Sequence, residues 1–363
     1  MKREHPLIHT VQIYSETHLK GEDSMDKTIA VLGTGAIGSS VGADFTKAGY
    51  DVVLIDQWPA HVEAMKSNGL HIKMPDEELH VRVRAFHLCE LCSIHPCFDI
   101  VFLTAKSYDT LWLTQFIKPY LKEDGVLVSL QNSMNDEWIP PIIGYQRDIG
   151  SVLELSGEVF EPGLVKRNTN QKKTWFALGE LHGRITPRLK EIAEILGHAG
   201  RVDITTNIWG AKMSKLVVNS MISAFSPVFG LRSSELIRRP ELVEISMKVG
   251  RESLEVGTTL GYNMEPIFGM SAEDLKGSTD DVLKKSLLTL VSNTGREARS
   301  MIFQDILKKR RTEIDYISGL IVRKGREAGV PTPFNETVTS VIKEIELGKA
   351  EPDVSNVSRF PTK

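Results

Sequence analysis

The stretch TIAVLGTGAIGSSVGADFTKAGYDVVLID, residues 28–56, contains the pattern that decides the fold of this chain. An apolar run at 29–32 leads into GTGAIG at 33–38, and a second apolar run at 52–55 ends on Asp56. In a strand, turn and helix of this kind, the glycines permit a sharp turn, a close approach of a pyrophosphate and tight packing of helix on strand. The alternative is a glycine-rich turn with a purely structural role. We favour a dinucleotide site, whose predicted contacts are Gly33, Gly35, Ala36, Ile37 and Gly38.

Asp56 bears on the choice of dinucleotide. It lies 18 residues beyond Gly38, at the end of the second predicted strand. A carboxylate at this position accepts hydrogen bonds from the adenosine ribose and repels a 2′-phosphate. The sequence therefore favours NAD(H) as the cofactor, with NADP(H) as the alternative.

The composition indicates a globular protein that acts on a small molecule. Of the 363 residues, 41% are hydrophobic and 25% are charged, and the formal net charge is -3. This small net charge predicts no binding to nucleic acid or to an anionic membrane surface. No apolar run reaches the roughly 20 residues of a membrane span, and the N-terminal segment lacks the apolar core of a secretory signal. We therefore expect a cytoplasmic protein with a small-molecule substrate.

The distribution of apolar residues predicts two domains. Strand-like runs at 29–32, 52–55, 100–104, 126–130, 151–155 and 175–178 alternate with helical segments such as 187–196, which is typical of a doubly wound sheet. Beyond residue 205 the apolar residues recur at helical period over 208–229, 233–260 and 286–328. The predicted architecture is an α/β dinucleotide-binding domain at 27–205 and an all-α domain at 206–349, between a disordered extension at 1–26 and a disordered tail at 350–363.

The three cysteines fall in one short segment, where Cys89, Cys92 and Cys97 stand close to His87 and His95. These residues are potential zinc ligands. Structural zinc sites usually take their ligands from two separated pairs, and the chain has no second pair. We therefore favour thiols without a metal and keep zinc as the alternative.

Several polar residues stand where a mechanism would use them. Lys106 and Asn132 each follow a predicted strand, and open α/β sheets bind their ligands at the carboxyl ends of strands. Lys215 and Asn219 are four residues apart, so they share one face of a predicted helix. The charged stretch 304–316 is interpreted most simply as a solvated helix face.

Taken in order, these motifs resemble the ketopantoate reductase family, the 2-dehydropantoate 2-reductases of pantothenate synthesis. The resemblance runs from about residue 27 to 349. It rests on GTGAIG at 33–38, LTAK at 103–106, LQN at 130–132, Trp209 followed by KLVVN at 215–219, and QD at 304–305 followed by TEIDYISG at 312–319.

The resemblance implies a Rossmann domain, a helical domain and a cleft between them. It casts Lys215 as the general acid that protonates the substrate carbonyl and Asn219 as a substrate-binding residue. Glu313 is expected to accept hydrogen bonds and to help orient Lys215, while Lys106 and Asn132 face the nicotinamide. A cationic donor suits this reaction because negative charge develops on the carbonyl oxygen.

Four positions depart from the family pattern. Ser133 stands where the family usually has glycine, and Ser223 stands where it often has a second asparagine. Met301 aligns with a position that often holds a substrate-binding serine, which leaves Ser300 one residue away. The family typically prefers NADPH, whereas Asp56 favours NAD(H). We therefore expect Ser223, Ser300 and Met301 to shape the substrate site for an acid that need not be ketopantoate.

The resulting hypothesis is an NAD(P)-dependent oxidoreductase that interconverts a 2-oxo acid and a 2-hydroxy acid, ketopantoate among them. Two alternatives stay open: a non-catalytic dinucleotide-binding sensor, and a related dehydrogenase that acts on a 3-hydroxy acid or an imine. Apolar faces on the helical domain are compatible with a homodimer and equally with a monomer.

Overall fold

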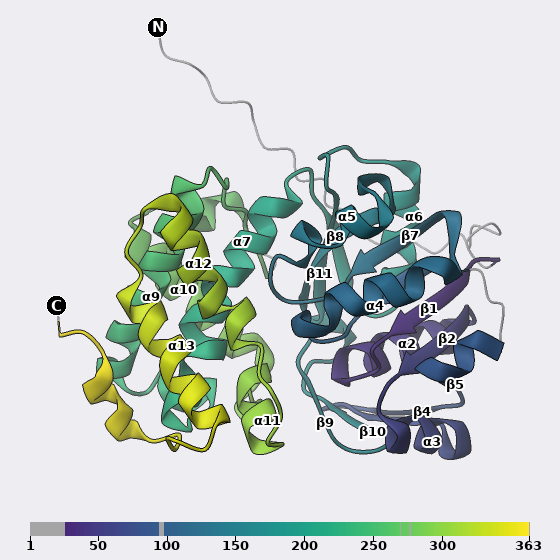
Figure 1. The fold of residues 1–363 in the computed structure, drawn as a ribbon, viewed down its shortest axis with the longest axis horizontal. Coiled ribbons are helices and arrows are strands. Elements are labelled where there is room, and N and C mark those ends of the chain that lie inside the picture. The colour runs from purple at the N-terminus through teal and green to yellow at the C-terminus, as the bar shows by residue number, and fades with distance from the viewer. Residues whose placement is uncertain (1–25, 94–97, 269, 276, 363) are drawn as a thin grey trace, which may run out of the picture.

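The computed structural model describes residues 26–93, 98–268, 270–275 and 277–362. Its sheet-containing domain and its helical domain lie side by side (Figure 1). The predicted extension at 1–26 falls almost entirely outside the described residues. The predicted fold class, a doubly wound α/β domain followed by an all-α domain, is confirmed.

An eight-stranded sheet forms the centre of the first domain. In spatial order its strands are β12 (Arg201–Ile204), β11 (Trp175–Glu180), β8 (Asp148–Glu154), β7 (Leu121–Ser129), β6 (Phe98–Leu103), β1 (Thr28–Leu32), β2 (Asp51–Asp56) and β5 (Arg84–His87). The pairs from β5 to β8 are parallel, and β11 runs antiparallel to β8. Because β1, β6 and β7 are parallel neighbours, their carboxyl ends bring the glycine turn, Lys106 and Asn132 to one edge.

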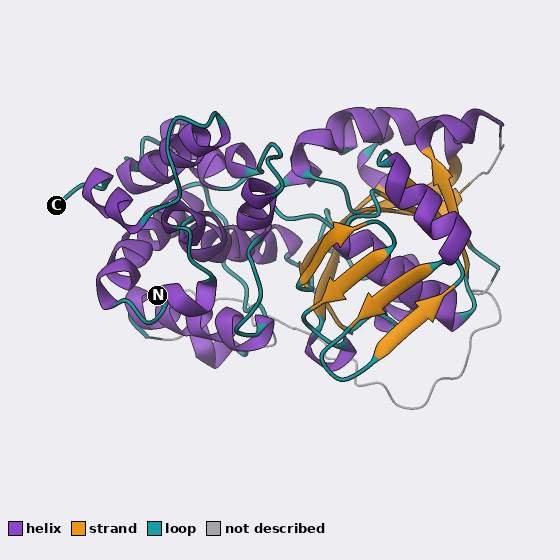
Figure 2. Ribbon diagram, turned by 90° about the horizontal axis from the view of Figure 1, so that it is seen from below, coloured by secondary structure: helices purple, strands orange, loops and turns teal. Residues whose placement is uncertain are grey.

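Helices cover both faces of this sheet (Figure 2). One apolar core contains side chains of α2 (Ala36–Ala48), α3 (Pro59–Asn68) and α6 (Pro187–Gly197), and the other contains those of α4 (Thr110–Ile117) and α5 (Pro140–Ile143). Burial on both faces explains the continuous apolar runs of the strands. Leu32 and Leu103 at the ends of β1 and β6 are completely buried, so the turns that follow them start from a rigid base.

A second, four-stranded sheet is absent from the sequence prediction. Its order is β4 (Glu78–Val81), β3 (Leu70–Lys73), β10 (Leu164–Arg167) and β9 (Gly157–Glu161). It packs on α2, which lies between this sheet and the large one, so the α2 residues from Gly38 to Phe45 are all buried. The strands are short and partly exposed, and β4 shows only weak alternation, so the apolar pattern did not reveal them.

The helical domain begins directly after β12. Its helices are α7 (Ile208–Val218), α8 (Ser233–Leu236), α9 (Pro240–Thr259), α10 (Thr279–Thr294), α11 (Met301–Leu307), α12 (Ser318–Ala328) and α13 (Pro333–Glu346). A π-helical turn, η7 (Asn219–Ala224), continues α7. Such turns are rare and often accompany functional sites. The segment 286–328, predicted to be helical, contains the end of α10 followed by α11 and α12. The chain leaves the helix at Gly295 and again between α11 and α12.

The predicted disordered tail is wrong for the part of it that is described. Residues Val354–Arg359 form a short 3-10 helix, and the Phe360 side chain is buried. Its ring centroid lies 5.5 Å from that of Phe225 and 6.0 Å from that of Phe229. The buried Phe360 ring, together with the hydrogen bond from Asn356 to the Val228 carbonyl oxygen, therefore holds a segment whose polar composition had indicated disorder.

Candidate active site

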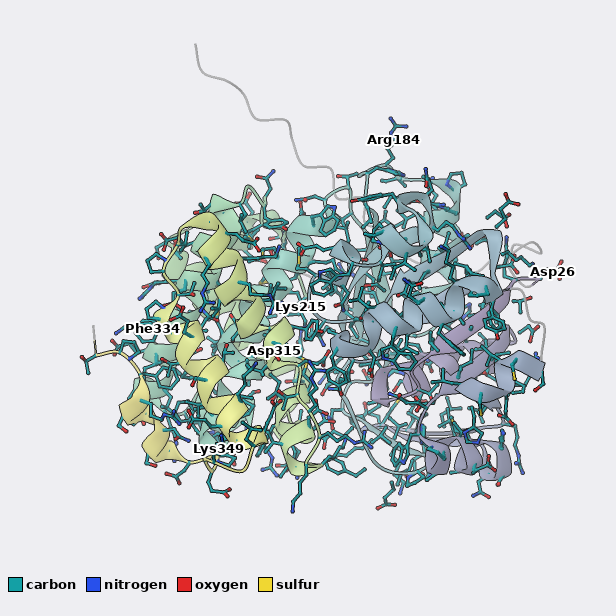
Figure 3. All side chains as sticks on the ribbon, viewed as in Figure 1. Asp26, Arg184, Lys215, Asp315, Phe334 and Lys349 are labelled. Carbon is teal, nitrogen blue, oxygen red and sulfur yellow. The ribbon has the colours of Figure 1, made fainter. Side chains whose placement is uncertain are left out.

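A cleft of about 690 Å³ opens between the two domains at the edge where β1, β6 and β7 end. Lys215 lies at the border between the domains (Figure 3). The predicted site residues that line the cleft are Gly33, Gly35, Ala36, Ile37, Asp56, Lys106, Asn132, Lys215, Asn219, Ser223, Ser300, Met301 and Glu313. Gly38 is not among the lining residues, because it packs behind the turn.

The structure gives a different reason for glycine at each of the three positions of the turn. Gly33 has φ +93°, and a side chain there would begin 2.7 Å from the Ala105 backbone. A side chain at Gly38 would collide with the Gly33 carbonyl oxygen and the Thr104 hydroxyl. Gly35, in contrast, has no atom within 4 Å of that point apart from its chain neighbours. It precedes the uncapped N-terminus of α2, so the backbone there is open to a phosphate and the N–H groups are free to bind it.

Two aromatic rings and two arginines form the end of the cleft near Asp56. Asp56 ends β2, and its Oδ1 accepts the backbone N–H of Trp58 at 2.7 Å. Arg310 lies over the Trp58 ring, with the guanidinium carbon 5.1 Å from the centroid. Arg311 lies 4.8 Å over the Tyr108 ring. These cation–π contacts join the segment after α11 to the sheet domain beside the predicted ribose position.

Glu313 accepts hydrogen bonds, as expected, but in the described structure they come from Lys106 and Ser107 and not from Lys215. Its Oε1 accepts from the Ser107 N–H at 2.8 Å and from the Ser107 hydroxyl at 2.9 Å, and its Oε2 lies 3.1 Å from Lys106 Nζ. Asp305 Oδ2 lies 2.6 Å from the same Nζ. Burial alone would lower the pKa of Lys106, but the carboxylates of Glu313 and Asp305 raise it above its usual value. Glu313 therefore joins the two domains through Lys106.

Lys215 is buried, and the carboxylate whose charge acts on it is Glu154. Burial lowers the pKa of Lys215 to about 8, and the carboxylate of Glu154 opposes this shift. Glu154 is the last residue of β8, and burial raises its pKa to about 7 against the effect of Lys215. The Lys215 Nζ also lies 4.5 Å over the ring of Phe268. A lysine that titrates near neutral pH in a cleft is typical of a proton donor.

A chain of hydrogen bonds connects the predicted substrate residues. Ser223 Oγ donates to Asn219 Oδ1 at 3.3 Å, and Asn219 Nδ2 donates to Asn132 Oδ1 at 2.9 Å. Asn132 Nδ2 in turn lies 3.0 Å from Met301 Sδ. The Ser300 hydroxyl caps α11 and donates to the Ser223 carbonyl oxygen at 3.0 Å, so it is already committed to structure.

Ser133, one of the departures from the family pattern, lies in the loop after β7. Ser133 has φ 80°, in the left-handed region that glycine adopts most easily. Its hydroxyl donates to the Tyr316 carbonyl oxygen at 2.7 Å. This bond accounts for a serine at a position where the backbone favours glycine.

Sequence reasoning missed Glu154 and Ser107. Glu154 falls inside an apolar run that was assigned to a strand, so its charge drew no attention. The signal that would have found it is its position as the last residue of a buried strand, the same rule that located Lys106 and Asn132.

The described cysteines, Cys89 and Cys92, are free and exposed, while Cys97 and His95 lie outside the described residues. Over the ranges that the structure describes, no group of three or more His, Cys, Asp or Glu side chains is arranged to hold a metal ion. None of the helices in those ranges combines the length and apolar character that crossing a membrane requires.

Comparison with known proteins identifies relatives along most of the chain. It is 29% identical to the 2-dehydropantoate 2-reductase of Archaeoglobus fulgidus over 328 residues, which cover 88% of this chain and 98% of the relative. It is 28% identical to the enzyme of the same name from Aquifex aeolicus, over 87% of this chain and 96% of the relative.

Solved structures agree with this result. The PanE/ApbA family ketopantoate reductase from Ralstonia eutropha JMP134 has a TM-score of 0.74 at 25% identity, covering 89% of this chain and 99% of that one. D-mandelate dehydrogenase has the same fold, with a TM-score of 0.76 at 22% identity over 89% of this chain and all but 1% of that one. The family model "Ketopantoate reductase PanE/ApbA" matches residues 29–180, and "Ketopantoate reductase PanE/ApbA C terminal" matches 207–346. This chain belongs to the ketopantoate reductase family.

Proposed function

We propose that this protein is an NAD(P)-dependent oxidoreductase that interconverts a 2-oxo acid and a 2-hydroxy acid, with Lys215 as the proton donor to the carbonyl oxygen. The observation that carries the proposal is one cleft lined by both the glycine turn and Lys215. The relatives named 2-dehydropantoate 2-reductase support the reaction type. They make ketopantoate the first substrate to test.

The residues present fit a nicotinamide dinucleotide. The open backbone at Gly35 and the N-terminus of α2 would hold its pyrophosphate, and Asp56 would accept bonds from its adenosine ribose. When bound, such a dinucleotide supplies or accepts the hydride. Charged Lys215 donates a proton to the carbonyl oxygen in reduction, and neutral Lys215 accepts one from the hydroxyl in oxidation. Asn219, which lines the same cleft, holds the substrate beside Lys215.

Substrate identity is tested by oxidation of NADH and NADPH with a panel of linear, branched and aromatic 2-oxo acids that includes ketopantoate. The matching hydroxy acids are run in the reverse direction. We expect one acid to reach a kcat/KM of about 10⁴ M⁻¹s⁻¹ or more. If another acid is turned over in preference to ketopantoate, we assign this change in substrate preference to Ser223 and Met301. Absence of turnover across the panel, with cofactor still bound, would favour a sensor and contradict the proposal.

We further propose that Asp56 makes NAD(H) the preferred cofactor. Changing Asp56 to Ala removes a carboxylate that would repel a 2′-phosphate, and Arg310 and Arg311 nearby supply positive charge that suits either cofactor. The ratio of the NADPH and NADH dissociation constants is expected to fall by about tenfold, close to the 1.4 kcal/mol expected of one charged hydrogen bond.

The measurement is fluorescence titration of both cofactors. Asp51→Ala is the control, because Asp51 begins the same strand at its opposite end and pairs with Arg84 at the surface. An unchanged ratio in Asp56→Ala would show that Asp56 does not contact the ribose.

A further inference from the structure

Glu154 is a buried carboxylate inside the cleft that the proposed chemistry has not yet used. It is 3% exposed and lines the same cleft as Lys215. Its Oε1 has no hydrogen-bond partner in the described structure, and its Oε2 accepts a long bond of 3.4 Å from Asn293 Nδ2. Burying a carboxylate with so few hydrogen bonds lowers the stability of the fold. A carboxylate in this position at the end of an apolar strand therefore indicates a functional role.

The groups around Glu154 single out Lys215 as its partner. Lys215 lies on α7, which packs against β8, and its charge acts on Glu154 without a described hydrogen bond or ion pair between them. Asn293 of α10 donates the one described hydrogen bond to Glu154. Arg299, on the segment before α11, is committed to Glu158 at 2.9 Å. Lys212, one turn before Lys215, points into the sheet, where its Nζ donates to a β8 carbonyl oxygen at 3.0 Å. Among these positively charged side chains, Lys215 is therefore the one whose charge acts on Glu154.

We propose that Glu154 is a positioning residue that keeps Lys215 charged and returns a proton to it after each reduction. This inference rests on the proposed role of Lys215. In reduction, one Nζ–H bond of Lys215 breaks as the O–H bond of the hydroxy acid forms, which leaves Lys215 neutral. The ionised Glu154 then takes a proton from solvent and passes it through water to the neutral Nζ, which leaves Glu154 ionised and Lys215 charged again. The net reaction consumes one hydride and one proton.

The titration of the two groups suits this exchange. Glu154, with a pKa of about 7, and Lys215, with a pKa of about 8, change charge over neighbouring pH ranges. Groups with such similar values exchange a proton at little cost in free energy, and they titrate as a pair.

Glu154→Gln tests the proposal through opposite effects on the two directions of the reaction. The charge of Glu154 raises the pKa of Lys215, so its removal lowers that pKa below about 8. Reduction requires charged Lys215. The alkaline limb of the plot of kcat/KM for reduction against pH therefore moves to lower pH, and kcat/KM falls by about tenfold near pH 8. Oxidation requires neutral Lys215, so its acidic limb also moves to lower pH and the rate there rises.

Two variants control for structural damage. Glu154→Asp retains the charge and is expected to restore much of the wild-type pH profile. Glu180→Gln removes an equally buried carboxylate, which pairs with Arg188 at 2.6 Å outside the cleft, and is expected to leave both limbs in place. A structural role for Glu154 would lower both directions at all pH values with unmoved limbs, and that result would overturn the inference.

A second readout needs no turnover. The rate at which an amine-reactive reagent modifies Lys215 is measured against pH by mass spectrometry, in wild type and in Glu154→Gln. We expect the midpoint to move to lower pH in the variant. If the midpoint of Lys215 modification shifts in Glu154→Gln but the protein turns over no acid, the proposed function is contradicted and the effect of Glu154 on Lys215 still holds. An unmoved midpoint would refute the pairing itself.

Discussion

Replacing Lys215 with Met is expected to lower kcat for reduction by about 10²–10⁴-fold, the usual loss when a general acid is removed. Methionine keeps the apolar length of the side chain, which packs over Phe268, and removes the charge and the protons. The affinity for NADH should change little, because Gly35 and Asp56, which we propose bind the phosphates and the ribose, lie on the other domain. The measurements are steady-state kinetics and fluorescence titration of NADH.

A matched control is available on α9. Lys248 lies 5.2 Å over the ring of Phe334, so it resembles Lys215 in its aromatic contact but lies outside the cleft. Lys248→Met is expected to retain wild-type kinetics. Wild-type turnover in Lys215→Met would remove this lysine from the mechanism, and equal losses in both variants would assign the effect to the fold.

The part of the site that was predictable follows from local rules. The glycine turn, Lys106 and Asn132 were located because each follows a buried parallel strand, and such strands present their carboxyl ends together. The pairing of Lys215 with Asn219 followed from helical spacing alone. These inferences use residues that are close in the chain or related by the regular geometry of one sheet.

The contacts between the domains were beyond prediction for a physical reason. Lys106 meets Glu313 and Asp305 across 207 and 199 residues of chain, and helical period cannot show which surface of one domain faces another. The charged stretch at 304–316 was therefore interpreted most simply as a solvated face, although Asp305 and Glu313 are 3% and 4% exposed. The resemblance singled out Glu313 as a site residue, and its described contacts are with Lys106 and Ser107. Its expected help in orienting Lys215 stays a prediction.

Glu313→Gln is expected to lower the free energy of unfolding by about 3 kcal/mol, because the variant leaves Lys106 with one carboxylate in place of two and turns an amide toward its charge. This value lies at the low end of the range usually found when one partner of a buried ion pair is removed, because a third of the Lys106 side chain is exposed. Chemical denaturation measures the change. Asp315→Asn, two residues away and paired with Lys343 near the surface, should cost about 1 kcal/mol or less.

The double variant Glu313→Gln with Lys106→Met tests whether Glu313 stabilises the protein through its ion pair with Lys106, here called the clasp between the domains, or by a general effect on the fold. If Glu313 acts through Lys106, the two single losses will not add, and the coupling energy will be about 1 kcal/mol or more. Additive losses would contradict the clasp. The pH profile supplies the other distinction: Glu313 has no described contact with Lys215, so Glu313→Gln should lower kcat/KM and leave the alkaline limb where it is. If the alkaline limb moves in Glu313→Gln but not in Glu154→Gln, then Glu313, and not Glu154, is the carboxylate that acts on Lys215.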